Sequence, residues 1–221
     1  MLLPRPGARM EAILSLVPPA SLVAEIGADH GILSAHLLAA GVAERMIVAD
    51  ISAASLNKAR RLFALHEIEE RAAFRVADGL HAIAGEAVGG VVVAGMGGKT
   101  IIRMLDTGAH WAKDAALILQ PNGDPAPLRH WLMEHGYRIE AERLAREDRR
   151  YYIALRAVPG EAHYQPQELL IGPCLLRENP PLLKDYLAWR MACLARAQGE
   201  AAQSTLAAMK SLQSDMDAVQ L

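Results

Sequence analysis

The predicted fold rests on one stretch of the sequence, Val23-Ala24-Glu25-Ile26-Gly27-Ala28-Asp29-His30-Gly31. The apolar residues that lead into Gly27 are typical of a strand, and residues 32–40 are typical of a helix. A strand that ends in a glycine turn and continues as a helix places backbone N–H groups and the positive end of a helix dipole at the carboxyl edge of a sheet. Open α/β sheets bind nucleotide-like ligands at that edge.

The alternation of strand and helix continues to about Val158. The expected strands are 22–26, 46–49, 73–76, 91–94 and 115–119, followed by a closing pair at 137–144 and 151–158. The run 91–94 is almost entirely β-branched, which is typical of a strand buried on both faces. This order predicts an α/β fold with a doubly wound, mostly parallel sheet and helices on both faces.

The composition changes after Pro159-Gly160. Apolar residues recur at helical spacing in 183–194 and again in 206–219, with Gly199 between the two runs. Such a pattern predicts a helical hairpin or short coiled coil. We therefore expect two parts, a nucleotide-binding domain at residues 1–158 and a C-terminal helical appendage at residues 159–221.

Composition limits the function classes. The 221 residues carry a net charge of −2, so a nucleic-acid partner would need a local basic patch rather than bulk charge. Cys174 and Cys193 match no metal or redox spacing, which predicts reduced thiols and no metal site. No apolar run reaches the roughly 20 residues of a membrane span, and the start lacks the apolar core of a signal peptide. These features predict a soluble cytoplasmic protein without a membrane partner.

Four predicted strand ends carry candidate ligand-binding residues. In the first, Asp29 and Ile32 replace glycines of the dinucleotide fingerprint, which disfavours an NAD-dependent oxidoreductase. Asp50 ends the second strand, where a carboxylate accepts hydrogen bonds from ribose hydroxyls. Asp78 ends the third and is suited to an adenine amine, and Met96 in the fourth lies among glycines that leave room for a ligand.

A ribose and an adenine without a phosphate, in an acidic pocket, indicate S-adenosylmethionine. Each residue alone is also explained as a helix cap or a turn residue, whereas their order along the chain favours a ligand. The cofactor-binding candidates are Glu25, Gly27, Asp29, His30, Asp50, Ile51, Asp78, Gly79, Gly95, Met96 and Gly97.

Four segments resemble the bacterial tRNA (adenine-N1)-methyltransferases that modify position 22. These segments are Gly27-Ala28-Asp29-His30, Ala94-Gly95-Met96-Gly97-Gly98, Leu119-Gln120-Pro121-Asn122, and Glu147-Asp148 with Tyr152. The resemblance covers essentially the whole chain and implies a Rossmann-like methyltransferase domain with a coiled-coil appendage, S-adenosylmethionine as cofactor and tRNA as partner. The chain departs from the family pattern at Glu25, where Asp is usual, and at residues 31–34, where an aromatic residue and Leu-Pro are usual.

Methylation of adenine at N1 depends on orientation, because the neutral base carries a lone pair and no proton at that atom. Positive charge moves onto the base, and a nearby carboxylate or amide oxygen stabilises it and holds the N6 amine. Asp29 and Asn122 are the first candidates for this role, with His30 and Tyr152 as outer candidates. Each of the last three residues has a competing structural explanation. His30 is also explained as a capping or core residue, Asn122 as a turn residue, and Tyr152 by packing in the sheet.

A paired adenine must be flipped out or locally unpaired, so the protein must also hold RNA phosphates. The RNA-binding candidates are Arg143, Arg146, Arg149 and Arg150, in a basic cluster that also contains Arg156 and to which Arg5 and Arg9 are candidate additions. An ordinary solvated surface also explains this cluster. The helical tail is an alternative RNA contact or a dimer interface, so a monomer and a homodimer both stay open. Two other functions stay open: methylation of a small molecule or a protein, and a non-catalytic scaffold that binds S-adenosylmethionine.

Overall fold

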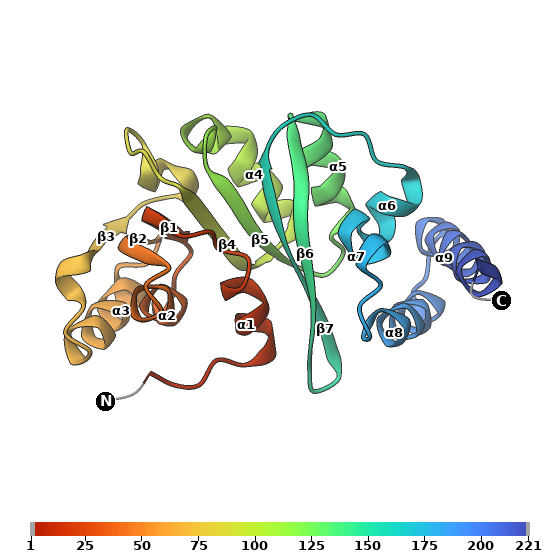
Figure 1. Ribbon diagram of the computed structural model, residues 1–221, viewed down its shortest axis with the longest axis horizontal. Helices are drawn as coiled ribbons and strands as arrows, with labels where there is room; N and C mark the ends of the chain where they lie inside the picture. Colours follow the sequence, from red (N-terminus) through yellow and green to blue (C-terminus); the bar gives the residue numbers. More distant parts are fainter. Residues whose placement is uncertain (1–2, 220–221) are drawn as a thin grey trace.

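The computed structural model describes residues 3–219, with side chains up to residue 214. The described strands form one sheet of seven in the order β3-β2-β1-β4-β5-β7-β6 (Figure 1). Their bounds are Ala20–Ile26 (β1), Ala43–Asp50 (β2), Ala72–Val76 (β3), Gly90–Gly97 (β4), Ala116–Asn122 (β5), Tyr137–Glu147 (β6) and Arg150–Pro159 (β7). The first five strands run parallel, and β7 runs antiparallel to β5 and β6. The predicted mostly parallel sheet with a closing pair of strands is confirmed.

Helices cover both faces of the sheet, as the alternating pattern predicts. On one face lie α1 (Ala8–Leu14), α2 (Ile32–Ala39) and α3 (Ala53–Leu65), and on the other lie α4 (Gly98–Gly108) and α5 (Ala126–Glu134) (Figure 1). Three short 3₁₀ turns add η1 (Glu69–Arg71), η2 (Gly79–Ile83) and η3 (Ala109–Ala112). Each face has its own buried apolar cluster, which includes Phe63 on the first face and Leu105 on the second. Among residues 3–219, no helix is both long and apolar enough to cross a membrane.

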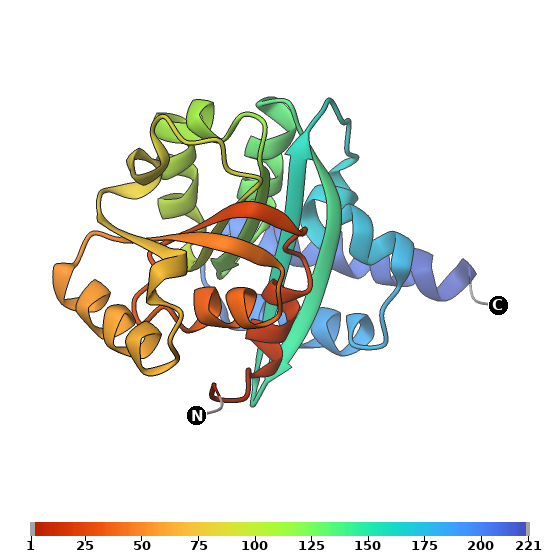
Figure 2. The ribbon, with the colours of Figure 1, turned by 60° about the vertical axis from the view of Figure 1, so that its left-hand side comes forward.

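Four helices follow the sheet: α6 (Pro166–Ile171), α7 (Pro173–Glu178), α8 (Leu183–Arg196) and α9 (Glu200–Val219). They lie beyond the β6–β7 edge, at the opposite end of the sheet from β3, and α9 extends away from it (Figures 1 and 2). Leu187 of α8 and Met209 of α9 belong to one apolar cluster, so these two helices form the expected hairpin. The side chains of Met216 and Val219, which complete the predicted apolar run, lie outside the described residues.

The segment before this hairpin is fastened to the sheet. Glu142 of β6 is buried, accepts a hydrogen bond of 2.8 Å from Arg129 Nε of α5, and accepts another of 3.0 Å from the backbone N–H of Cys174 on α7. Cys174 itself belongs to the apolar cluster of the sheet. The described residues after β7 therefore comprise a part packed on β6 and a hairpin that extends from it, while the domain boundary at residue 158 stays a prediction.

Three strands end three residues later than predicted, β6 at Glu147 rather than residue 144 and two others at the candidate site. The fourth and fifth strands were expected to end at Ala94 and Leu119, but β4 and β5 continue to pair up to Gly97 and Asn122. A bulge between Ala94 and Met96 permits this, because Gly95 adopts a left-handed backbone with φ +76°. The bulge changes the direction of the end of β4, where Ala94, Gly95 and Met96 line the floor of a cavity.

Candidate functional site

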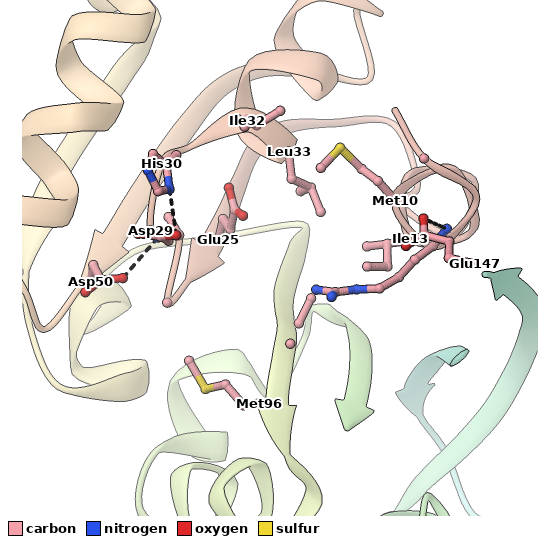
Figure 3. A pocket seen from close by; sticks show the side chains of 16 residues that line it. Met10, Ile13, Glu25, Asp29, His30, Ile32, Leu33, Asp50, Met96 and Glu147 are labelled. Atoms are coloured by element: carbon pink, nitrogen blue, oxygen red, sulfur yellow. Dashed lines mark hydrogen bonds and ion pairs between the residues drawn. The ribbon is translucent and has the colours of Figure 1, made fainter. Parts of the chain in front are cut away.

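A cavity of about 690 Å³ opens at the carboxyl edge of the sheet, between the ends of β1 and β4 (Figure 3). Here the chain order reverses, because β1 has β2 on one side and β4 on the other. Doubly wound sheets bind their ligands at this switch point, and the volume is in the range of small-molecule sites. The walls come from the turn after β1, the end of β2, the end of β4 and one face of α1.

The turn between β1 and α2 is held by backbone hydrogen bonds to β2. The N–H groups of Gly27 and Ala28 donate to the Ala49 carbonyl at 2.8 and 2.9 Å, and the N–H of Asp29 donates to Asp50 Oδ2 at 3.0 Å. Gly27 and Asp29 both have positive φ, at 74° and 46°. A side chain at Gly27 would meet only the flexible end of Met96, which can move aside, so the left-handed backbone is the main reason for glycine at this position.

Glu25 is the buried acid of the cavity, with 7% of its surface exposed. Its Oε2 accepts hydrogen bonds from the Ser34 hydroxyl and, at 3.0 Å, from the Ser34 backbone N–H. Burial raises the pKa of Glu25 from 4.5 to about 7, the Ser34 hydrogen bonds oppose this rise, and the charges of Asp50 and Asp29 add to it. This carboxyl therefore titrates near neutral pH, and its Oε1 is left to face a ligand.

Asp29, His30 and Asp50 form the acidic side of the cavity, opposite Met10, Ile13 and Glu147 (Figure 3). The Nδ1 atom of His30 lies 2.6 Å from Asp29 Oδ2, and both side chains are at least half exposed. Asp50 also accepts a hydrogen bond of 2.8 Å from the Ser52 N–H through Oδ1. Backbone donors thus fix the Asp50 carboxylate and leave a second lone pair on each oxygen for a ligand.

A second cavity of about 410 Å³ lies beside the first, and Arg9 of α1 lines both. The end of β5, the start of β7 and helix α8 form its walls, and its polar and aromatic lining includes Asn122, Tyr152 and Trp189. Asn122 Nδ2 donates to the Gly95 carbonyl at 2.7 Å, so this amide reaches the floor of the first cavity. The second cavity has three arginines and no carboxylate among its described lining residues.

Most of the predicted site residues line one of these two cavities. The first is lined by Glu25, Gly27, Asp29, His30, Asp50, Gly95 and Met96, and the second by Asn122, Arg150 and Tyr152. Ile51, Asp78, Gly79 and Gly97 line neither cavity. Ile51 is 73% exposed, the backbone at Gly79 packs against Met104 of α4, and Gly97 precedes α4. Asp78 is exposed at the start of η2.

The four predicted RNA-binding arginines lie on the β6–β7 hairpin and are all exposed. Arg143 is paired with Glu178 of α7 at 3.3 Å, and the guanidinium of Arg146 lies 5.6 Å from the centre of the Tyr151 ring. Arg149 and Arg150 form no ion pair and no cation–π contact with other described residues. Arg150 lies at the start of β7 and also lines the second cavity, so it connects the hairpin tip to that cavity.

Three site features were not predicted from the sequence. Arg9 and Glu147 line the first cavity, and α8 supplies Tyr186, Trp189 and Arg190 to the second. Arg190 pairs with Asp124, in the loop after Asn122, at 2.8 Å. The apolar spacing of α8 indicates packing only, so no local signal marks its other residues as cavity residues.

Comparison with known proteins agrees with this geometry. A family model described as a methyltransferase domain matches residues 7–155. A tRNA (adenine(22)-N(1))-methyltransferase of Bacillus subtilis (strain 168) is 29% identical over 186 residues, which are 80% of this chain and 78% of that protein.

Solved structures share the fold over nearly the whole chain. A Streptococcus pneumoniae protein, described as a candidate tRNA (m1A22) methyltransferase and solved in complex with S-adenosyl-L-methionine, has a TM-score of 0.85 at 28% identity and covers 92% of this chain and 97% of its own. The B. subtilis M1A22 tRNA methyltransferase TrmK, at 24% identity, has a TM-score of 0.79 over 94% of this chain and 95% of its own, which shows the common fold. The chain therefore belongs to the methyltransferase-domain family and, within it, to the bacterial tRNA (adenine(22)-N1)-methyltransferase family.

Proposed function

We propose that this chain transfers the methyl group of S-adenosylmethionine to N1 of an adenine in tRNA, at position 22. The observation that carries the proposal is the pair of adjoining cavities. An acidic cavity lies at the switch point of the sheet, and an aromatic and basic cavity lies beside it, with Asn122 bonded across their boundary.

The residues of the first cavity fit S-adenosylmethionine. Asp50 offers carboxylate oxygens to ribose hydroxyls, and the buried carboxyl of Glu25 offers Oε1 to an ammonium. Asp29 lies where a pyrophosphate-binding turn would have glycine, so the site favours a cationic ligand over a dinucleotide. When bound, this cofactor supplies an electrophilic methyl group on a positively charged sulfur.

The second cavity is our candidate site for the target adenine. Asn122 Nδ2 donates to the Gly95 carbonyl, and Oδ1 accepts a long hydrogen bond of 3.5 Å from Gln120 Nε2, so a second lone pair on Oδ1 remains to accept from the adenine N6 amine. Tyr152 offers a ring face for stacking, and Asp29 and His30 lie at the mouth of the first cavity. A new bond forms between N1 and the methyl carbon as the carbon–sulfur bond breaks, and the positive charge passes to the base without loss of a proton. The Asn122 oxygen stabilises that charge.

We further propose that the β6–β7 hairpin holds tRNA phosphates, chiefly through Arg149 and Arg150, with Arg146 beside them. Arg143 contributes less, since Glu178 already neutralises it. In this proposal residues 1–158 form the catalytic domain and residues 159–221 complete the tRNA-binding surface. The enzyme acts in the cytoplasm, where its substrate is.

The decisive experiment is methyl transfer from labelled S-adenosylmethionine to unmodified tRNA transcripts, followed by nucleoside analysis. We expect 1-methyladenosine in the wild-type reaction, loss of that product with Asp29→Ala, and loss with a transcript that carries guanine at position 22. Label that enters only protein or small molecules would contradict the tRNA assignment. Cofactor binding without transfer to any acceptor would favour a scaffold.

A further inference from the structure

We propose that the buried ion pair between Arg129 and Glu142 positions helix α8 as a wall of the second cavity, so that methyl transfer depends on the pair and cofactor binding does not. Arg129 lies on α5 and Glu142 on β6, and both side chains have 0% of their surface exposed. The effect on methyl transfer rests on the proposed function, whereas the effect on α8 does not.

The pair binds the ends of two successive helices. Arg129 Nη1 donates to the carbonyls of residues 169 and 170, in the last turn of α6, at 3.0 and 3.3 Å. Glu142 Oε2 accepts from the backbone N–H groups of residues 174 and 175, in the first turn of α7, at 3.0 and 3.4 Å. Between them, Nε and Nη2 of Arg129 both lie 2.8 Å from Glu142 Oε1. Each charge therefore lies at the helix end whose free backbone groups it can satisfy.

The corner between α6 and α7 consists of one residue, Gly172, which ends the first helix and begins the second. Its φ of +127° favours glycine, and a Cβ at this position would collide with both carboxylate oxygens of Glu142. The backbone of the corner and the ion pair are therefore in direct contact, and neither can shift without the other.

A buried ion pair of this kind specifies geometry more than it adds stability. Two charges lose their hydration on burial, and apolar residues of similar volume commonly stabilise a fold as well or better. A pair bonded on both sides instead permits one arrangement of α5, β6, α6 and α7. Any shift of these elements would leave a buried charge or a buried backbone group without its partner.

The position of the corner determines where α8 lies. Residues 179–182, which include two prolines, join α7 to α8 and leave little freedom between these helices. Tyr186 of α8 packs in one apolar cluster with residues of α6 and α7, and it also lines the second cavity. Burial raises the pKa of Tyr186, and the charges of Arg129 and Glu142 are close enough to affect it in opposite directions. A shifted corner would therefore move this wall of the second cavity and leave the first cavity, at the ends of β1 and β2, in place.

Removal of both charges separates positioning from stability. In the double variant Arg129→Met with Glu142→Leu no buried charge is left unpaired, so the chain should fold. Calorimetry, tRNA methylation at saturating substrates and amide hydrogen exchange are measured on the same full-length preparations. We expect an affinity for S-adenosylmethionine within about twofold of the wild type and a kcat lower by about 10- to 100-fold, because a displaced wall misaligns the reacting groups. Exchange should be faster in peptides of residues 183–196 and unchanged in those of residues 20–40.

Gly172→Ala is the second variant, since it disturbs the corner and keeps every charged side chain. It should also lower kcat at unchanged cofactor affinity, which keeps the test decisive if the double variant does not fold. Arg129→Lys should keep part of the activity, because lysine retains the charge but lacks the planar fork that reaches Glu142 and α6 together. Full activity in Arg129→Lys would show that charge alone suffices and would overturn the positioning role.

Arg75→Met with Glu86→Leu is the matched control. Arg75 of β3 pairs with Glu86 and donates to the carbonyl of Ala82 at 2.7 Å, at the opposite end of the sheet from α8, and neither partner lines the first or the second cavity. This control should leave kcat and the exchange of α8 unchanged.

Three results would overturn the assignment of Arg129 and Glu142 as positioning residues: wild-type kcat in the double variant, unchanged exchange in α8, or equal losses of kcat and cofactor affinity. If the wild type did not methylate tRNA, the proposed function would fail by itself. Faster exchange of α8 in the double variant would then still support the positioning role, and unchanged exchange would overturn it.

Discussion

The two cavities on either side of Arg9 are built in different ways. The acidic cavity takes Glu25, Asp29, His30 and Asp50 from the ends of β1 and β2 and from the turn after β1, and the end of β4 supplies an apolar floor. The aromatic and basic cavity combines the end of β5, the start of β7 and helix α8, which span residues 121–190. The proposed cofactor cavity is thus encoded in local strand-end motifs, while the proposed substrate cavity depends on how distant segments pack.

The two cavities are also held in place by different contacts. The acidic residues of the first cavity are held by hydrogen bonds between the turn after β1 and the end of β2, such as the bond from the Asp29 N–H to Asp50. The loop that follows Asn122 is held by helix α8, through the ion pair between Arg190 and Asp124. We therefore expect substitutions to separate cofactor binding from methyl transfer.

Asn122→Ala should give the largest difference between the loss of methyl transfer and the loss of cofactor affinity. Loss of the amide oxygen removes a group that stabilises the developing charge, so kcat for tRNA methylation should fall by about 100- to 1,000-fold. The affinity for S-adenosylmethionine should stay within about threefold, because Asn122 lines the second cavity. Single-turnover kinetics and calorimetry on the same preparations measure the two effects. A parallel loss of cofactor affinity would show that the cavities act as one site.

Asp50→Ala should have the opposite effect, a loss of cofactor affinity without a loss of tRNA affinity. This change removes the carboxylate assigned to the ribose, and the affinity for S-adenosylmethionine should fall by about 10- to 100-fold with little change in tRNA affinity. Asp78→Ala is the matched control, because Asp78 also follows a strand of the sheet but lies outside the cavity lining. An equal effect of both substitutions would restore Asp78 to the cofactor site that the sequence predicts.

The same contrast explains what the sequence could predict. Alternating strands and helices predicted the parallel sheet, and Glu25, Asp29 and Asp50 line the cavity because a strand end fixes which edge of the sheet a residue occupies. That rule does not fix where a side chain or turn points, so Ile51, which is exposed, and Gly79, which packs on α4, line neither cavity, and their predicted role in cofactor binding stays a prediction. The cavity residues of α8 could not be predicted, since apolar spacing shows how a helix packs and not what its other residues meet.

A smaller effect is expected on the stability of the ligand-free protein. The pKa of Glu25 is raised from 4.5 to about 7, so the folded state binds more protons than the unfolded state between these pH values. Stability from this residue is therefore fully present below pH 4.5 and is lost as the pH rises towards 7. Glu25→Gln should match the wild type near pH 4 and have a higher free energy of unfolding at pH 8, by about 1 to 2 kcal/mol.

Urea unfolding of both proteins at several pH values measures this difference, and residues other than Glu25 cancel in the comparison. A constant difference across the pH range would show that Glu25 titrates at its ordinary pKa. Affinity for S-adenosylmethionine should also rise in the wild type from pH 6 to pH 8, because the ionised carboxyl is the form that attracts an ammonium. This rise should be smaller in Glu25→Gln.

The smallest effect is expected for the ion pair between Arg190 of α8 and Asp124, in the loop after Asn122. It tests whether α8 positions the second cavity without affecting the first. Arg190 is mostly buried, with 14% of its side chain exposed, and its partner Asp124 is the more exposed at 42%. Arg190→Gln should lower kcat by about three- to tenfold and leave cofactor affinity unchanged, since a pair of this kind contributes about 1 kcal/mol. Asp124→Asn should have a similar effect, and the double variant should be no worse than either single variant if both act through one ion pair. Additive losses would instead show that Arg190 contacts tRNA directly, and the C-terminal helices would then bind substrate as well as position the loop.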